Sequence, residues 1–370
     1  MKRYFFIVLI LFVLLVSACV PAPQSPAETP SLTAPIPPTN SPVPSATATP
    51  LPSATLVNTV RPETSPTTVD SIITCVAVAF LPDNSRILSY DRSNVQIFDL
   101  GSMRKVDLMK APANLVSVAL SPDGQTLAWA MEDNTIQLVR LSDHQLLHTF
   151  TGNIDRSMNQ VTKLKFTPDG TRLVSASHDT WVRIWDMDGK QVDAFQPTGA
   201  DDLPKQVMAV GVSPDGKRLA SVPDDGPVKL WDLATHQKVA ELGGTGAYDT
   251  SDVAFSPDGQ FVAADLATGQ FLWRVADGRA LLGDSAPINS MAFAFSPDGR
   301  FLAYADLNNV ILSSPDGSQV IRSLEGHQSP LWSLVFSPDG SKLASRDGVE
   351  VRIWQVPDGK LLYTGKSNCP

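Results

Sequence analysis

Two short motifs in this chain resemble loops that bind phosphate or calcium. Residues 211–217, Gly-Val-Ser-Pro-Asp-Gly-Lys, match the first part of a phosphate-binding loop, in which backbone amides and a lysine hold the phosphate. Arg218 follows where a serine or threonine must hold magnesium, and a β-prone run follows where a helix is required. Asp186–Gly189 resembles the start of a calcium loop but lacks the closing glutamate. Both motifs are better explained as hairpin turns than as ligand sites.

The other polar residues do not form a catalytic or metal-binding pattern. The carboxylate pairs Asp201-Asp202 and Asp224-Asp225 fall in expected loops, where solvated charges are ordinary. The sequence contains no Gly-x-Ser-x-Gly motif. The five histidines fall in different parts of the chain and lack the spacing of zinc ligands: His144, His148, His178, His236 and His327. We therefore expect no enzymatic activity, no bound metal and no cofactor.

The chemistry that the sequence supports best is lipid attachment at Cys19. Lys2 and Arg3 precede an apolar stretch, Phe5–Val16, that is too short for a comfortable membrane span. The residues Val16–Cys19 then resemble the bacterial lipobox, at which the cysteine is diacylated and becomes the first residue of the mature chain. An ordinary secretory signal and an uncleaved anchor helix are the alternatives. We expect residues 1–19 to be a lipoprotein signal, and the protein to be held outside the cytoplasm on a bacterial cell membrane by its acyl chains.

Composition separates residues 20–70 from the rest of the chain. This segment is rich in Pro, Ser, Thr and Ala, and it lacks the apolar content needed to fold. Because prolines favour extended conformations, the sequence predicts a disordered, semi-stiff tether. The formal net charge of the chain is −9. An acidic chain lacks the basic surface that binds phosphate groups, so we expect no nucleic-acid partner.

A tetrapeptide close to Ser-Pro-Asp-Gly recurs along the remaining chain. Proline fixes φ, aspartate binds nearby backbone and glycine supplies φ > 0, so each copy predicts a hairpin turn between two β-prone runs. The seven copies are spaced 40 to 46 residues apart: Leu81–Asn84, Ser121–Gly124, Thr167–Gly170, Ser213–Gly216, Ser256–Gly259, Ser296–Gly299 and Ser337–Gly340. This period is that of one four-stranded propeller blade. We therefore predict that residues 71–370 fold as an all-β, seven-bladed β-propeller with four-stranded antiparallel blades, and that the propeller is monomeric.

The third predicted strand of each unit carries the most characteristic sequence. It reads Val-Arg-Ile-Trp-Asp at Val182–Asp186 and Val-Lys-Leu-Trp-Asp at Val228–Asp232, with weaker versions in other units. These residues resemble the WD40 repeat family, whose Gly-His pair survives once, as Gly326-His327. The TolB-type propeller family is an alternative, since its repeats also carry Ser-Pro-Asp-Gly, but the Trp-Asp strands favour WD40.

The resemblance implies a function and several site residues. In the seventh unit His327, Ser345, Asp347 and Trp354 match the family's buried hydrogen-bond chain. An aspartate is expected in the loop between the second and third strands, and Asp265 is the least securely aligned candidate for it. The matched partner-binding face includes Tyr90, His178, Met208, Met291, Trp332 and Arg346. We expect a non-catalytic scaffold that binds unidentified proteins. The alternatives are a receptor for a small solute or glycan in the central channel and a TolB-like envelope assembly factor.

The closure of the ring depends on the chain ends. The last unit contains its own fourth strand, Lys360–Thr364, and no clear strand precedes Ile72, although Thr55–Val60 is a possibility. Alignment with the preceding unit brings Cys369 close to Cys75, so we expect a disulfide between them. An extracytoplasmic location favours this bond. The alternative is a buried Cys75 and a free Cys369.

Overall fold

The computed structural model describes one compact unit within Pro52–Pro370. The described residues are 59–60, 67–73, 76–102, 104–112, 114–150, 160–198, 203–244, 252–266, 269–282 and 292–367. Every regular element in these ranges is a β-strand. Within the same ranges, no helix has the length and apolar character needed to cross a membrane.

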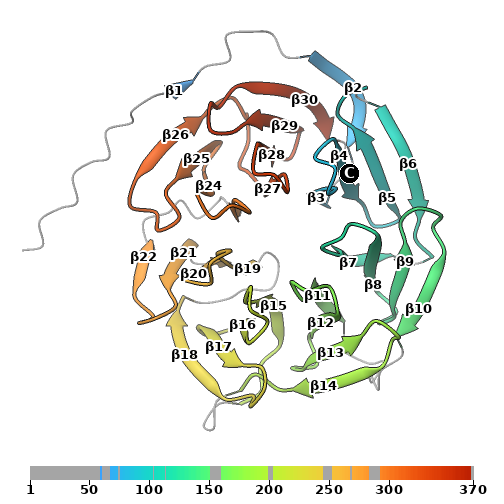
Figure 1. The fold of residues 1–370 in the computed structure, drawn as a ribbon, viewed down its shortest axis with the longest axis vertical. Helices are drawn as coiled ribbons and strands as arrows, with labels where there is room; N and C mark the ends of the chain where they lie inside the picture. Colours follow the sequence, from blue (N-terminus) through green and yellow to red (C-terminus); the bar gives the residue numbers. More distant parts are fainter. Residues whose placement is uncertain are drawn as a thin grey trace, which may run out of the picture. The chain divides into compact units, whose positions relative to one another are not determined.

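The strands form seven sheets around a central axis, each running from an inner to an outer strand (Figure 1). Blade 1 comprises β3 (Val76–Phe80), β4 (Arg86–Tyr90), β5 (Asn94–Asp99) and β6 (Arg104–Lys110), and blade 2 comprises β7 (Leu115–Leu120), β8 (Thr126–Met131), β9 (Ile136–Arg140) and β10 (Leu146–Phe150). Blade 3 comprises β11 (Val161–Phe166), β12 (Arg172–Ser177), β13 (Val182–Asp186) and β14 (Gln191–Phe195), and blade 4 comprises β15 (Val207–Val212), β16 (Arg218–Pro223), β17 (Val228–Asp232) and β18 (Lys238–Gly243). Blade 5 comprises β19 (Asp252–Phe255), β20 (Phe261–Leu266), β21 (Gly269–Arg274) and β22 (Ala280–Leu282). Blade 6 comprises β23 (Phe293–Phe295), β24 (Leu302–Asp306), β25 (Asn309–Ser313) and β26 (Val320–Leu324), and blade 7 comprises β27 (Ser333–Phe336), β28 (Lys342–Arg346), β29 (Glu350–Gln355) and β30 (Leu361–Ser367). The predicted all-β, seven-bladed propeller is confirmed.

The repeated Ser-Pro-Asp-Gly turns join the first and second strands of the blades. In blade 4 the Ser213 hydroxyl donates to Asp215 Oδ1 at 2.6 Å, and the Lys217 amide donates to the same oxygen at 3.0 Å. Gly216 has φ 69°, a conformation that glycine adopts without strain. The turns of blades 7 and 1 also meet, because the Asp339 amide donates to Asn84 Oδ1 at 3.0 Å. The motif therefore fixes each hairpin and helps to close the ring.

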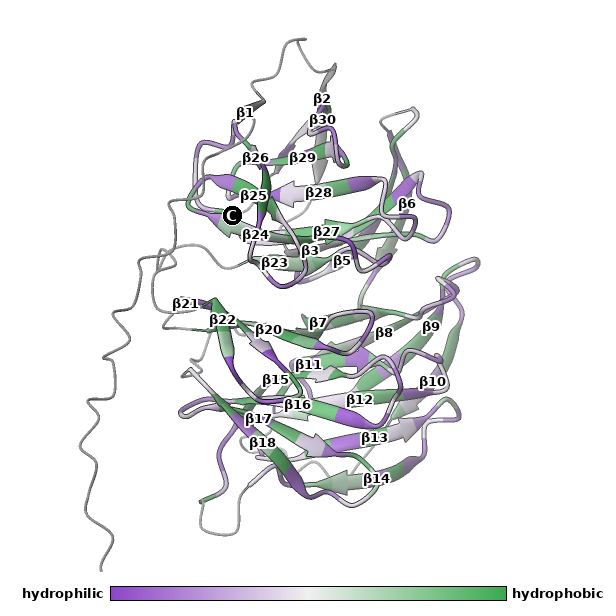
Figure 2. Cartoon of the chain, turned by 60° about the vertical axis from the view of Figure 1, so that its left-hand side comes forward, coloured by the Kyte–Doolittle hydropathy of each residue, from purple (hydrophilic) through white to green (hydrophobic). Residues whose placement is uncertain are grey.

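The hydrophobic cores lie between neighbouring blades. Phe150 of blade 2 stacks on Trp185 of blade 3, with ring centroids 5.4 Å apart. Apolar residues of blades 7 and 1, including Ile353 and Phe98, form a cluster of the same kind. Hydrophobic residues run along the strands of the blades (Figure 2). Because both faces of a blade pack on neighbours, the strands need more apolar residues than an exposed sheet would.

Two strands precede the propeller repeats and correct one expectation. β1 (Thr59–Val60) pairs in parallel with β26, and β2 (Thr67–Ile73) pairs in parallel with β30. The sheets of blades 6 and 7 therefore have five strands. The expectation that no clear strand precedes Ile72 is wrong, since the β-branched run at Thr67–Val69 adds to the outer edge of blade 7. The last blade nevertheless contains its own fourth strand, β30, as predicted.

Candidate functional site

Four of the predicted site residues lie outside the described ranges. These are Cys19, Cys75, Met291 and Cys369. The signal at residues 1–19 and most of the predicted tether also fall there.

The remaining residues of the predicted partner-binding face do not form one exposed surface. Trp332 is 65% exposed, whereas Met208 and Arg346 are buried and His178 is part-buried. Tyr90 is also buried, because it packs in the core between blades 1 and 2. Only Trp332 of this described set is therefore well exposed to a partner.

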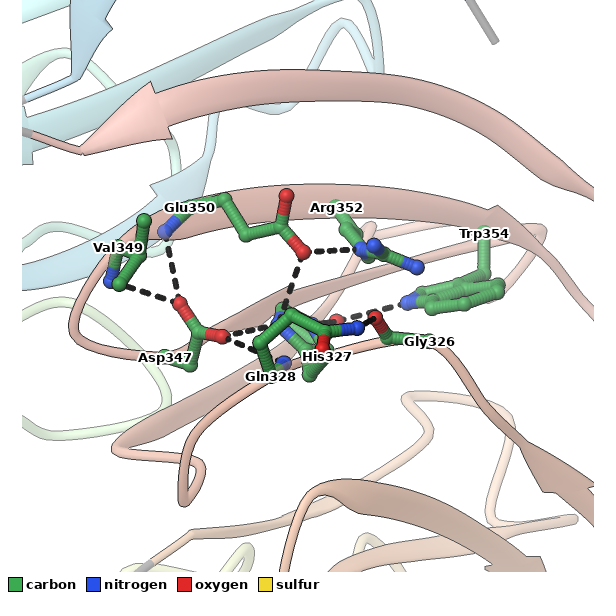
Figure 3. A network of polar contacts seen from close by, with 9 residues as sticks. Gly326, His327, Gln328, Asp347, Val349, Glu350, Arg352 and Trp354 are labelled. Carbon is green, nitrogen blue, oxygen red and sulfur yellow. Dashed lines mark hydrogen bonds and ion pairs between the residues drawn. The ribbon is translucent and has the colours of Figure 1, made fainter. Parts of the chain in front are cut away.

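The structure brings His327, Ser345, Asp347 and Trp354 together in blade 7. Figure 3 shows His327, Asp347 and Trp354 of this group. Trp354 Nε1 donates to Ser345 Oγ at 2.7 Å, and Ser345 Oγ lies 2.7 Å from His327 Nε2. His327 Nδ1 lies 3.1 Å from Asp347 Oδ2. The histidine, which is 4% exposed, thus links the loop before β27 to strands β28 and β29.

The loop between β28 and β29 holds Asp347 as an anion. Its Oδ1 accepts from the amides of Val349 and Glu350, each at 2.7 Å. Burial would raise the pKa of Asp347, but the bonds from His327 and from these amides overcome it and hold the pKa well below its usual range. The carboxylate therefore stabilises a loop that would otherwise leave its amides unpaired.

Blades 3 and 4 contain part of the same arrangement. Trp185 Nε1 donates to Ser175, and Trp231 Nε1 donates to Ser221, each at 2.9 Å. In blade 3 the loop aspartate, Asp179, pairs instead with Arg183 at 2.6 Å. A different partner thus takes the place of the missing histidine.

The cluster in blade 7 also includes residue types that bind metals. Potential ligand atoms of His327, Asp347 and Glu350 lie within 4.8 Å of one another. However, Glu350 Oε1 accepts from Arg352 Nε at 2.6 Å, and a cation placed there would be repelled by the guanidinium. We interpret the cluster as a structural hydrogen-bond network.

A pocket with a volume of about 470 Å³ lies beside this network. It is lined by Leu307, Asn308, Asn309, Glu325, Gly326, His327 and Gln328. Leu307 is 49% exposed, and its carbonyl accepts from the Leu331 amide, next to Trp332. The Trp332 amide in turn donates to the Arg346 carbonyl, near Val349, which is 58% exposed. We call Leu307, Trp332 and Val349 the apolar patch of blades 6 and 7.

Two histidine–aspartate pairs between blades were missed by the sequence reasoning. His144 Nε2 lies 2.7 Å from Asp107, and His236 Nε2 lies 2.8 Å from Asp193. Both histidines have φ > 0 in the hairpin before the outer strand, where four other blades have a glycine with φ > 0. The sequence does contain a pattern that could have indicated these pairs. Each histidine is followed by a glutamine at the same position of its repeat, and each lies about one repeat length after an aspartate in the outer strand of the preceding blade.

A second polar cluster joins blades 3 and 5 at the channel. Lys163 Nζ lies 3.2 Å from Asp252 Oδ2, and Lys165 Nζ lies 3.4 Å from Asp252 Oδ1. Asp265 is the cross-strand partner of Asp252. The alignment of Asp265 with the loop aspartates is therefore wrong, because this residue lies inside strand β20 and not in the loop that follows it.

Comparisons with known proteins agree with the repeat analysis. The family described as "WD domain, G-beta repeat" matches residues 144–186 and 318–349. An uncharacterised WD repeat-containing protein of Synechocystis sp. is 30% identical over 117 residues, which are 30% of this chain and 34% of that protein. A WD repeat-containing protein of Schistosoma mansoni is 29% identical over 120 residues, which are 31% of this chain and 39% of that protein.

These matches therefore span little more than a third of either relative. The matched segments fall in blades 2 and 3 and in blades 6 and 7 of the ring. Together with the seven blades and the repeated Trp-Asp strands, these matches support assignment of the chain to the WD40 repeat family.

Proposed function

We propose that the protein is a non-catalytic scaffold that binds a protein partner through the apolar patch of blades 6 and 7. The exposed Trp332 carries this proposal. Trp332 is 65% exposed, and backbone hydrogen bonds bring its segment next to those of Leu307 and Val349, which are also exposed. Contiguous exposed apolar residues mark interaction sites. Tryptophan is also among the residues that contribute most to binding at protein interfaces.

The neighbouring pocket gives the patch a shape that a partner side chain can fill. Its lining combines the apolar Leu307 with the polar side chains of Asn308, Asn309 and Gln328. Such a polar rim beside an apolar anchor is typical of protein interfaces. The blades beneath are hydrogen-bonded sheets of five strands with a buried core between them. A partner would therefore meet a preformed surface.

The proposal can be tested by replacing the anchor. We expect Trp332→Ala to reduce capture of the partner by about tenfold or more, with thermal stability almost unchanged because the side chain is exposed. Val239→Ala is the matched control, since Val239 is 48% exposed on the outer strand of blade 4. Capture would be measured by crosslinking on intact cells followed by quantitative mass spectrometry. Equal capture by all three proteins would contradict the proposal.

We further propose that Cys19 carries the lipid that anchors the scaffold to an extracytoplasmic membrane surface. The lipobox-like sequence before Cys19 supports this assignment. Intact mass of the wild-type protein should show a chain that begins at Cys19 and carries acyl groups, and Cys19→Ala should carry none. A wild-type chain without acyl groups would contradict lipidation at this residue.

The channel receptor is a weaker second candidate. Polar groups converge there, which favours binding of a small solute, but Lys163 and Lys165 both already pair with Asp252. A ligand would have to compete with these ion pairs. The exposed patch requires no such rearrangement, and we therefore prefer it.

A further inference from the structure

Two aspartates face each other on the inner strands of blade 5. Asp252 of β19 and Asp265 of β20 occupy directly opposite positions in the antiparallel pairing. Like charges in such positions destabilise a sheet. The side chain of Asp252 is 39% exposed, whereas Asp265 is 2% exposed and its Oδ1 has no hydrogen-bond partner among the described residues. The two carboxyl groups therefore differ strongly in environment.

Within the described part of the chain, Asp252 forms ion pairs and Asp265 does not. Lys163 and Lys165 of blade 3 both reach Asp252, at 3.2 and 3.4 Å. These pairs skip blade 4, whose residues at the equivalent repeat positions are Ala209 and Gly211. A Cβ at Gly211 would lie 2.6 Å from the Val253 carbonyl oxygen, so the inner strands of blades 4 and 5 are in close contact. The ion pairs thus connect blades 3 and 5 around a tightly packed blade 4.

Other blades show that the fold does not need these charges. Lys163 and Asp252 occupy the same repeat position in blades 3 and 5, and the other blades have alanine or serine there. At the position of Lys165, the other blades have alanine, glycine or valine. The residues that hold the position of Asp265 in the other blades are Tyr90, Ala130, Ala176, Val222, Ala305 and Arg346. A buried acid beside another acid is therefore specific to blade 5.

The surroundings of Asp252 and Asp265 shift the pKa values of the two carboxyl groups in opposite directions. Burial disfavours the charged form of Asp252, but Lys163 and Lys165 overcome it and lower the pKa of Asp252 to about 2. Burial and the charge of Asp252 raise the pKa of Asp265 to about 8, against the smaller effect of Lys163. At neutral pH Asp252 is an anion, and Asp265 holds its proton.

We propose that Lys163, Lys165, Asp252 and Asp265 form a proton-controlled latch across the channel, closed while Asp265 is protonated. When Asp265 gives its proton to the solvent, it becomes a second anion beside Lys163 and competes with Asp252 for that lysine. The contact between blades 3 and 5 then weakens. The phenol of Tyr90 lies close enough to Lys163 and Asp252 to interact with both of them. The residue opposite Asp265 on β21 is the uncharged Gln270.

Hydrogen exchange of the full chain at pH 6.5 and 9 tests this latch. After correction for the intrinsic rates, amides of 161–166 and 252–266 should exchange up to about tenfold faster at pH 9 in the wild type. Asp265→Asn should abolish this difference and keep the latch closed at both values. Asp306→Asn, at the end of the corresponding strand of blade 6, should behave like the wild type. Lys163→Met should raise exchange at both pH values.

A direct titration makes the test independent of the variants. The carboxyl carbon signal of Asp265, assigned by its absence from the Asp265→Asn spectrum, should titrate with a midpoint near 8. A midpoint near 4 would overturn the proposal. An unchanged pH response of exchange in Asp265→Asn would overturn it as well.

Discussion

Ile73 and Ser367 lie opposite each other in the parallel pairing of β2 with β30. Cys75 follows Ile73 by two residues, and Cys369 follows Ser367 by two residues. Both cysteines lie outside the described residues, and a parallel pairing that continued by two residues on each strand would bring them together. The register of the described strands therefore supports the proposed Cys75–Cys369 disulfide.

We predict that the two cysteines are bridged in protein from an oxidising compartment. Intact mass should increase on alkylation only after reduction, by two alkyl groups for a chain lipidated at Cys19. The loop-entropy relation gives roughly 5–6 kcal/mol for so long a loop, as an upper figure. Reduction should therefore lower the melting temperature clearly. Two thiols that alkylate without reduction would show that the bond is absent.

Replacement of Asp265 should stabilise the protein at neutral pH. The folded pKa of about 8 lies above the ordinary value of 3.8, so the folded protein binds more protons than the unfolded chain between these values. The free energy of unfolding therefore falls as pH rises through this window. One pH unit within this window corresponds to roughly 1.4 kcal/mol. Asp265→Asn should therefore raise the free energy of unfolding above that of the wild type by a few kcal/mol at pH 7, and should leave it unchanged below about pH 4. Urea denaturation at several pH values would measure this difference, and equal stability at pH 7 would contradict it.

The hydrogen-bond network of blade 7 should contribute more to the free energy of unfolding than the partial network of blade 4. Ser345→Ala removes the partner of both Trp354 Nε1 and His327 Nε2, which are buried, and should cost about 2–4 kcal/mol. Ser221→Ala removes only the partner of Trp231 Nε1 and should cost about 1–2 kcal/mol. Chemical denaturation of both variants would give the comparison. Equal losses would mean that the histidine bond contributes nothing measurable.

Contacts between neighbouring turns can be isolated with two glycine variants. Gly124 and Gly216 have φ of 68° and 69°, so alanine at either position should cost about 1 kcal/mol or more of backbone strain. A Cβ at Gly124 would also overlap the ring of Pro82 in the preceding turn, whereas a Cβ at Gly216 meets no atom within 4 Å. Gly124→Ala should therefore lower the melting temperature more than Gly216→Ala. The reverse order would show that adjacent turns are free to move apart.

The local features of this fold could be read from the sequence. Ser-Pro-Asp-Gly specifies its own hairpin, because its serine, aspartate and glycine contacts all lie within a few residues, and its period gives the blade size. The network around His327 was predictable because it joins motifs of a single repeat.

Features that depend on contacts between blades were harder to predict. The charges of Lys163 and Asp252 are 89 residues apart, and nothing in either repeat alone indicates that they meet. The burial of Tyr90 depends on the shape of blade 2, so its exposure could not be derived from its position in the repeat. The parallel addition of β2 was missed because a short β-prone run lies within a segment of tether-like composition.

The pairing of β1 and β2 has a consequence for the order of events during synthesis. Both strands leave the ribosome long before their partners, because β26 ends at Leu324 and β30 at Ser367. Chains fold from the N-terminus as they emerge, and early strands without partners stay exposed. β1 and β2 can therefore be paired only after β26 and β30 have emerged, although both are made much earlier.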